Sequence, residues 1–256
     1  MQTDEIAAAV LAALAERRQI APFAGLTTPA AYRAAALVRD ARIGRGERVV
    51  GRKIGFTNRT IWDEYSVHAP IWGYVYDRTL HDHAEPADAA GFVEPRIAPE
   101  IVFGLGRDLR PGAGADEIAA AIAWVAHGFE IVQSLYAGWR FAAADTVAAF
   151  GLHGGLWVGP RRPLRPDDDL ENFEIALSRN GVVADRGRAA NVLDGPLHAL
   201  RHLVEVLKDD PDHPPLNAGE IVTTGTLTRA FPIAPGEVWT TDLSGLDLPG
   251  ARLAVI

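Results

Sequence analysis

The chain has 256 residues and a formal net charge of −8, with 48% hydrophobic and 23% charged residues, a composition that can supply the core of an ordinary globular protein. Its basic residues are scattered among carboxylates, which argues against nucleic acid as the main partner. The lack of cysteine excludes disulfides, thiolate zinc sites and cysteine nucleophiles, and it fits a reducing cytoplasm.

The N-terminal region is predicted to be helical. Residues 3–18 form an amphipathic pattern with Thr3 as a candidate cap, and a Thr-Pro pair opens a second helical pattern over residues 28–42. The first pattern starts acidic and ends at Arg17 and Arg18, which argues against a secretory signal and against a membrane span. We therefore expect a cytoplasmic protein with no membrane partner.

From residue 49 onward the chain consists mostly of short β-prone runs bounded by glycine or proline. The runs cover residues 49–56, 71–76, 91–104, 125–133, 153–158, 171–178, 181–185, 219–224 and 236–242, and helices are predicted at 116–124, 141–149 and 196–208. This irregular order favours an α+β fold with a curled mixed sheet over a regular βαβ series. We predict a helical cap over residues 1–48 and a single β domain over residues 49–256.

Lysine is almost absent from this sequence. Of 25 basic residues only Lys53 and Lys208 are lysines, and all the others are arginine. An ammonium group can lose its proton when buried, whereas arginine keeps its charge at any working pH. Lys208 stands beside two aspartates and is typical of a solvated helix end. Lys53 lies in an apolar β-prone run, where either a catalytic role or a plain edge-strand charge is consistent with the pattern.

Two glutamates have apolar neighbours in predicted strands. Glu100 follows an Ile-Ala-Pro run and precedes Ile-Val-Phe, and Glu130 lies between Gly-Phe and Ile-Val. Strand carboxylates that point into one cavity would make an oxygen-rich site suited to Mg²⁺ or Mn²⁺. The alternative is that each glutamate faces solvent on an alternating strand, and spacing alone favours that alternative.

Other polar motifs are less specific. The turn at residues 223–228 is rich in threonine, so its hydroxyls and amides can hold a carboxylate, although such turns are commonly just turns. His153 lies among glycines, which permit close approach of a ligand. The pair His81 and His83 falls in a polar stretch and is expected to be solvated. Neither a Gly-x-Ser-x-Gly elbow nor a phosphate-binding loop occurs.

Taken in chain order, these segments resemble the 2-keto-4-pentenoate hydratase and 4-oxalocrotonate decarboxylase group of the fumarylacetoacetate hydrolase superfamily. The similarity covers nearly the whole chain and is carried by residues 46–57, 94–101, 129–134 and 217–228. It implies a mixed β-roll, a homo-oligomer, and a divalent metal (Mg²⁺ or Mn²⁺) that chelates a small 2-oxo acid of aromatic catabolism and stabilises its enolate.

Residue roles follow from the resemblance position by position. It implies Lys53 and Asp77 as catalytic residues, Thr224, Gly225 and Thr226 as substrate-binding residues, and Glu100 and Glu130 as metal ligands. Arg78, Phe150 and His153 depart from the family pattern in the same pocket, and there we expect His153 to be catalytic and Arg78 and Phe150 to bind the substrate. Lys53 would move protons or anchor the substrate, and Asp77 would relay protons along the conjugated dienol.

The sequence departs from the family pattern inside the expected pocket. The usual Glu-x-Glu reads Ala98-Pro99-Glu100, so one of three carboxylate ligands is missing. Three explanations stay open: His153 replaces the ligand in a site better suited to Mn²⁺, Fe²⁺ or Zn²⁺, Glu94 reaches in, or metal binding is weakened or lost. We rank weakened or lost metal binding first, because losing a charged ligand should cost much of the affinity for a hard cation. Lys53, Arg78 and His153 would then handle the carboxylated substrate.

The expected function is that of a lyase, a hydratase acting on a small unsaturated 2-oxo acid through an enol or enolate. Alternatives are a diverged decarboxylase, tautomerase or C–C bond lyase that works with or without metal, and a non-catalytic partner subunit. The presence of Lys53, Glu100 and Glu130 argues against a fully non-catalytic role.

Overall fold

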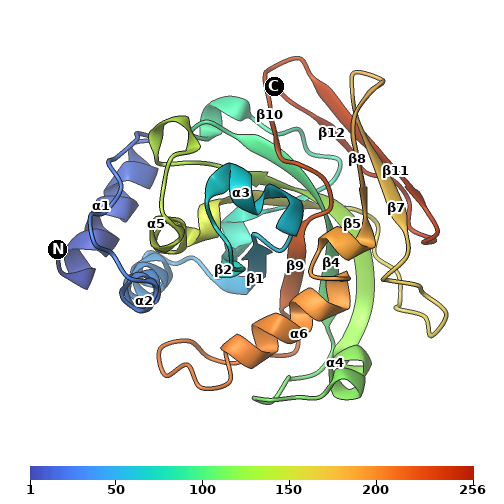
Figure 1. The fold of residues 1–256 in the computed structure, drawn as a ribbon, viewed down its shortest axis with the longest axis horizontal. Coiled ribbons are helices and arrows are strands. Elements are labelled where there is room, and N and C mark those ends of the chain that lie inside the picture. The colour runs from blue at the N-terminus through green and yellow to red at the C-terminus, as the bar shows by residue number, and fades with distance from the viewer.

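The computed structural model describes all residues 1–256 and contains two β-sheets (Figure 1). In spatial order the larger sheet comprises β2 (Ile71–Tyr76), β1 (Val49–Gly55), β9 (Ile221–Thr226), β4 (Arg96–Leu105), β5 (Ile122–Val132), β6 (His153–Val158) and β3 (Leu80–Asp82), with β10 (Phe231–Pro232) paired to β4. The smaller sheet comprises β12 (Arg252–Ala254), β11 (Val238–Ser244), β7 (Glu174–Arg179) and β8 (Val182–Arg188). Two neighbouring pairs in the larger sheet, β1–β9 and β3–β6, are parallel, so the sheet is mixed.

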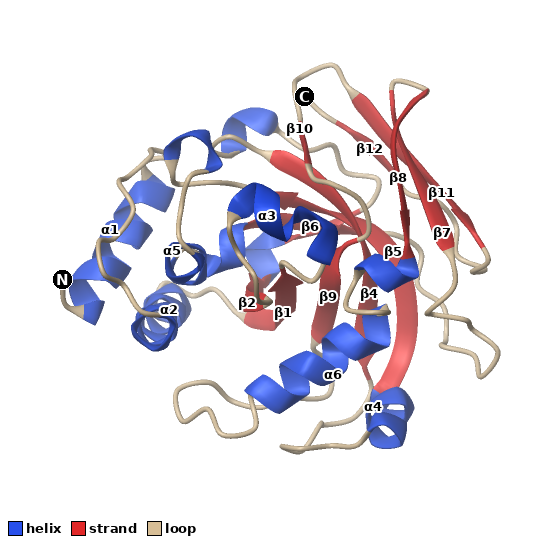
Figure 2. Cartoon of the chain, viewed as in Figure 1, coloured by secondary structure: helices blue, strands red, loops and turns tan.

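The larger sheet is curled rather than flat. Strand β2, at one end of the strand order, contacts β6 near the other end, and helices and the smaller sheet surround the curl (Figure 2). Helices α4 (Ala115–Ala121) and α6 (Pro196–Val206) cover one side, and α6 packs against β9. The predicted α+β class with a curled mixed sheet is confirmed.

The N-terminal helices form close to their predicted positions, although the first is capped by Gln2 rather than Thr3 and ends at Ala15 rather than at residue 18. Helix α1 (Thr3–Ala15) buries Ile6, Val10 and Ala13 on one face, and α2 (Thr28–Gly44) begins at the cap Thr27, whose hydroxyl accepts a hydrogen bond from the backbone of Ala30. Both helices pack with α5 (Ala143–Ala148). The division of the chain at residue 48 into two units stays a prediction. None of the helices combines the length and the apolar character that crossing a membrane requires.

One predicted helix is partly wrong. The alanine-rich stretch predicted to be helical through residue 124 leaves the helix at Ala121, and β5 starts at Ile122. In β5, Trp124 pairs with Gly104 of β4, and a Cβ at Gly104 would lie 1.8 Å from the Trp124 ring. Cross-strand pairing and ring packing therefore outweigh the local helix propensity.

Short elements were not predicted, because two to four residues carry too little periodic pattern to be recognised. They are β3, β10, β12 and the single-turn helix α3 (Trp62–Tyr65). Strand β3 contains His81, whose ring stacks on Trp157 with 4.4 Å between centroids, so His81 is half-buried rather than solvated.

The sheet topology brings distant residues together. Strand β1 lies between β2 and β9, so Lys53 pairs with Gly73 on one side and with Thr223 on the other. In the antiparallel β4–β5 pair, Ala98 is directly opposite Glu130. Opposite residues of such a pair project from the same face. Lys53 is thereby placed near two strands that carry carboxylates.

The site depends on a close backbone approach at Gly73. A Cβ at this position would lie 2.3 Å from the carbonyl oxygen of Phe150, where the next residue, Gly151, contacts Lys53. We predict that Gly73→Ala lowers the free energy of unfolding by about 1–3 kcal/mol, the typical cost of overpacking, as measured by chemical denaturation. Gly44→Ala is the control, because its Cβ would meet nothing within 4 Å. Equal stabilities of the two variants would contradict this role of Gly73.

Candidate active site

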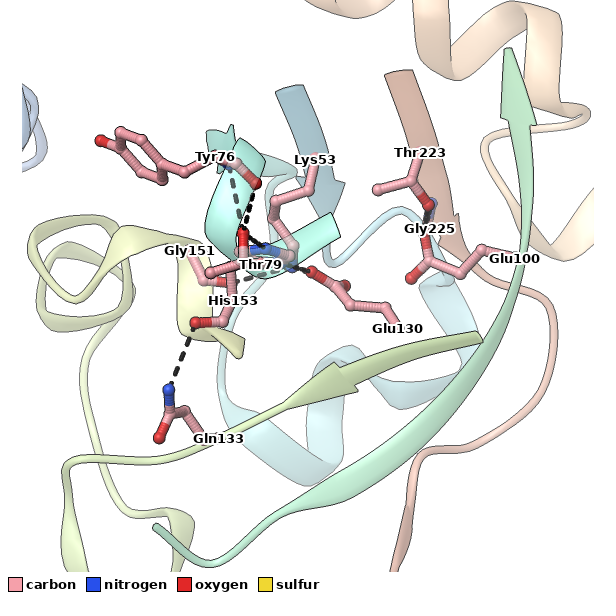
Figure 3. Close-up of polar contacts among 10 residues, drawn as sticks. All are labelled: Lys53, Tyr76, Thr79, Glu100, Glu130, Gln133, Gly151, His153, Thr223 and Gly225. Atoms are coloured by element: carbon pink, nitrogen blue, oxygen red, sulfur yellow. Dashed lines mark hydrogen bonds and ion pairs between the residues drawn. The ribbon is translucent and has the colours of Figure 1, made fainter. Parts of the chain in front are cut away.

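Lys53 is buried at the centre of the candidate site. Its Nζ donates a hydrogen bond to the carbonyl oxygen of Gly151 at 2.8 Å and lies 3.1 Å from Oε2 of Glu130 (Figure 3). The exposed fractions of the Lys53 and Glu130 side chains are 3% and 0%. Because β1 has neighbours on both sides, the interpretation of Lys53 as a plain edge-strand charge is wrong.

Glu130 also contacts His153. Its Oε1 is hydrogen-bonded to His153 Nδ1 at 2.7 Å, and His153 Nε2 is hydrogen-bonded to Thr79 Oγ1 at 2.9 Å. Burial, helped by the charge of Lys53, lowers the pKa of His153 well below its usual value, so the imidazole is neutral near pH 7. The side chains of Lys53, Glu130, His153 and Thr79 therefore form one continuous chain of contacts, as Figure 3 shows.

Glu100 faces the same pocket from β4. Its Oε2 accepts hydrogen bonds from the Thr223 hydroxyl and, at 2.8 Å, from the backbone of Gly225. Burial, reinforced by the charge of Glu130, raises the pKa of Glu100 to about 8. Burial also raises the pKa of Glu130, but Lys53 opposes that shift. Lys53 is therefore paired with Glu130, and the raised pKa of Glu100 favours the protonated form of that carboxyl near pH 7.

The free space in the pocket is about 50 Å³ as the side chains stand. Its lining comprises Lys53, Gly55, Phe56, Ile61, Tyr65, Ala98, Glu100, Glu130, Val132, Trp139, Gly151, Leu152, Thr226 and Ala230. Lys53 and the two glutamates supply the charged groups of this lining, and three aromatic rings supply much of the rest. A larger open groove on the smaller sheet is lined by residues such as Glu174, Arg186 and Asp242, which are exposed.

The side chains present do not fit a three-carboxylate metal site. Ala98 presents a methyl group opposite Glu130, where the family pattern has a carboxylate. Oε1 of Glu130 is hydrogen-bonded to the His153 ring, whereas Oε2 lies 3.1 Å from Lys53 Nζ and has no hydrogen-bond partner. No cluster of three histidine, cysteine, aspartate or glutamate side chains has the arrangement of a metal site. Mg²⁺ is commonly held by one or two carboxylates together with waters, so Glu100 and Glu130 are the residues that would hold it.

Both candidates for the third ligand make other contacts. Both ring nitrogens of His153 are hydrogen-bonded, to Glu130 and to Thr79. Glu94 is exposed, and its carboxylate accepts hydrogen bonds from the backbone of Gly138 at 3.1 and 3.2 Å. Glu94 itself has a left-handed backbone conformation, with φ of 44°, just before β4 begins. His153 and Glu94 therefore stay predictions as the third ligand.

Asp77 and Arg78 do not join the pocket. Asp77 pairs with exposed Arg48 at 3.0 Å, and hydrogen bonds from the backbone and side chain of Arg48 hold the pKa of Asp77 below its usual value. Arg78 is exposed. Both residues lie in the short 3₁₀ turn after β2, which directs them outward, whereas Thr79 of the same turn reaches His153.

Of the predicted substrate-binding residues, some lie at the pocket and others do not. Thr226 lines the pocket, but its hydroxyl donates to the carbonyl of Thr228. Gly225 is not a lining residue, and its amide donates to the lining residue Glu100. Thr224 projects from the other face of β9, where its hydroxyl donates to Ile101. Phe150 is buried in the apolar cluster beside the N-terminal helices, and its successors Gly151 and Leu152 line the pocket instead.

Sequence reasoning missed the Thr79 hydroxyl and the aromatic wall, and it placed Thr223 only within a threonine-rich turn. The pairing of Thr223 with Lys53 and its hydrogen bond to Glu100 depend on the sheet register. Thr79 has no local signal, since it meets His153 across 74 positions of the sequence. The same holds for Tyr65 and Trp139, which come from separate short helical turns.

The buried ion pair sets a stability prediction. Glu130→Gln leaves the buried Lys53 ammonium without a counter-ion, so we expect a loss of about 3–5 kcal/mol in the free energy of unfolding. Adding Lys53→Met removes the stranded charge, and the double variant should be more stable than the sum of the two single losses predicts. Glu64→Gln, in the exposed pair with Arg229, is the control and should cost at most about 1 kcal/mol. If the stability losses of the two single variants add up to the loss of the double variant, the coupling between Lys53 and Glu130 is refuted.

Comparisons with known proteins agree with this geometry. Residues 64–248 match the family model described as fumarylacetoacetate (FAA) hydrolase C-terminal. The chain is 32% identical to a 2-hydroxyhexa-2,4-dienoate hydratase of Comamonas testosteroni, over 91% of this chain and 90% of that protein. It is 31% identical to a 2-keto-4-pentenoate hydratase of Paraburkholderia xenovorans over 96% and 92%, and to a 4-oxalocrotonate decarboxylase of a Pseudomonas species over 76% and 75%.

The solved structure of 4-oxalocrotonate decarboxylase from Pseudomonas putida G7, complexed with magnesium and adipate, is also similar to this chain. It matches with a TM-score of 0.91 and 27% identity, covering 100% of this chain and 97% of the other. The predicted β-roll is thereby confirmed. A family model that spans most of the chain, relatives above 30% identity and a shared fold lead to one conclusion: the chain belongs to the fumarylacetoacetate hydrolase family.

Proposed function

We propose that this protein is a lyase that acts on a small unsaturated 2-oxo acid through an enol or enolate, as a hydratase of the 2-keto-4-pentenoate type. The main support is the buried Lys53–Glu130–His153 chain, with Glu100 facing the same pocket. The activities named for the relatives are of this class. Decarboxylation is the second candidate, supported by the similarity over the whole chain to a 4-oxalocrotonate decarboxylase.

Lys53 is proposed to act on the oxygen that gains negative charge. Both reactions build charge on the 2-oxo oxygen as the enolate forms, and a positive donor held in a dry pocket stabilises that charge. The ammonium has three N–H donors, and the protein engages it through Gly151 and Glu130. The remaining donor can meet the substrate oxygen, because Lys53 lines the pocket.

Glu100 is proposed to exchange a proton with the substrate carbon chain. It lies in the pocket wall, and hydrogen bonds from Thr223 and Gly225 fix one carboxyl oxygen in place. Glu130 and His153 act as positioning residues, because Glu130 holds the ammonium and His153 holds Glu130. Hydration then requires only that water reach the far end of the conjugated system.

We further propose that tight Mg²⁺ binding is weakened here relative to Glu-x-Glu relatives. In those relatives a divalent cation would polarise the 2-oxo and carboxylate oxygens. Here Ala98 removes one carboxylate and Lys53 neutralises another, so the lysine supplies part of the positive charge. A homo-oligomeric state also stays a proposal, based on the family.

Lys53 gives the main test of activity. Wild type incubated with 2-hydroxypenta-2,4-dienoate should remove the ultraviolet absorbance of the diene, and Lys53→Arg should lower turnover about 10²–10⁴-fold, because the wider guanidinium misplaces the donated proton. Lys208→Arg is the matched control, since Lys208 is exposed and far less constrained. Full turnover by Lys53→Arg would remove Lys53 from the mechanism. No turnover of this acid or of 4-oxalocrotonate, with any divalent metal, would refute the proposed function.

The metal proposal has a gain-of-function test. Ala98→Glu restores the missing carboxylate opposite Glu130, and Mg²⁺ affinity measured by titration calorimetry should rise at least about tenfold. Ala98→Gln has the same size without the charge and should bind no more tightly than wild type. Stoichiometric tight Mg²⁺ binding by wild type, with no gain in Ala98→Glu, would contradict a weakened site.

A further inference from the structure

Arg96, at the start of β4, is not itself a lining residue of the pocket, but it packs against two residues that are. Arg96 precedes Ala98 by two residues and Glu100 by four, and side chains two apart on a strand project from the same face. Its cross-strand partner on β5 is Val132, which lines the pocket two residues beyond Glu130. From Glu100 to Arg96 the strand advances about 13 Å, so Arg96 marks the opposite end of this face.

The guanidinium of Arg96 lies against the aromatic part of the pocket wall. Its central carbon is 4.4 Å from the centroid of the Trp139 ring and 5.7 Å from that of Tyr65, and Nη1 donates a hydrogen bond to the Tyr65 hydroxyl. Both rings line the pocket. Nε of Arg96 is buried and has no hydrogen-bond partner. The aromatic rings therefore hold a cation whose hydrogen-bonding capacity is largely unused.

Arg96 also lacks a counter-ion. Five arginines of the chain are not exposed, namely Arg39, Arg42, Arg52, Arg96 and Arg162. The other four each pair with a carboxylate, at distances between 2.5 and 2.8 Å. No carboxylate lies within 4.0 Å of Arg96, although partly buried charges are normally paired.

We propose that Arg96 binds a second carboxylate at the far end of the substrate. The pocket would then select a dicarboxylic 2-oxo acid over a monocarboxylic one, with the 2-oxo end at Lys53 and the distal carboxylate at Arg96. Guanidinium suits this task, because its planar donors match a carboxylate in a bidentate pair. The assignment of the reacting end rests on the proposed function, whereas the assignment of the distal end rests on the unpaired charge.

Turnover of two substrates tests the selection. The pair is 2-hydroxypenta-2,4-dienoate, with one carboxylate, and 2-hydroxyhexa-2,4-dienedioate, with two. Arg96→Gln should lower kcat/KM for the dicarboxylate about ten- to a hundredfold, mainly through KM, and change the value for the monocarboxylate by much less. Arg229→Gln is the control, because this arginine precedes pocket residue Ala230 but is paired with Glu64 at 2.9 Å. An equal effect of Arg96→Gln on both substrates would overturn the proposal.

Equilibrium binding separates this inference from the proposed reaction. Adipate and hexanoate have six carbons each and differ in the second carboxylate, so their affinities can be compared by calorimetry without turnover. Wild type should prefer adipate, Arg96→Gln should lose that preference, and Arg96→Lys should keep part of it. An adipate preference that depends on Arg96 supports the inference even if neither dienoate is turned over. No preference in wild type, or an unchanged preference in a folded Arg96→Gln protein, would overturn it.

Discussion

The buried ion pair between Lys53 and Glu130 is the interaction on which the site depends. Removing both charges from water is costly, and the cost is offset only when geometry and additional hydrogen bonds are good. Here the carbonyl of Gly151 and the ring of His153 supply those bonds. The curled sheet is what allows this, because β1 is inserted between β2 and β9 and therefore carries Lys53 into the interior. The close approach of Gly73 to the Phe150 backbone belongs to the same arrangement.

The same pair explains how the pocket tolerates the loss of a carboxylate at position 98. Three carboxylates around one small space need a divalent cation to balance them, whereas two carboxyl groups can be balanced by one ammonium and one bound proton. The raised pKa of Glu100 is consistent with that balance. In the proposed function, Ala98 and the Lys53–Glu130 pair are two parts of one charge balance, in which Lys53 supplies positive charge at the reacting end.

The two ends of the pocket differ in character. The inner end combines charges of both signs in a dry setting, while the outer end consists of aromatic rings with one cation against them. An extended, partly unsaturated acid matches this layout, since its carbon chain can lie along apolar walls between polar ends. The unpaired charge of Arg96 adds a preference for a second carboxylate, which the inner end alone does not provide.

Local patterns were sufficient for much of this protein. Apolar periodicity and caps predicted both N-terminal helices, β-prone runs predicted most long strands, and the rarity of lysine together with the ordered motifs pointed to Lys53, Glu100, Glu130 and His153. These features are readable because each depends on residues close together in the sequence.

What the tertiary structure decided is which side chains meet. Asp77 and Arg78 follow a strand that lines the interior, yet their turn directs them to the surface, while Thr79 of the same turn reaches His153. His153 was a candidate metal ligand by sequence, but the fold places Glu130 and Thr79 on both of its nitrogens. Arg96 was an ordinary arginine by sequence, and its missing counter-ion became visible only in three dimensions. Contacts between distant strands and turns have no local signature, because they depend on sheet register and backbone direction rather than on neighbouring residues.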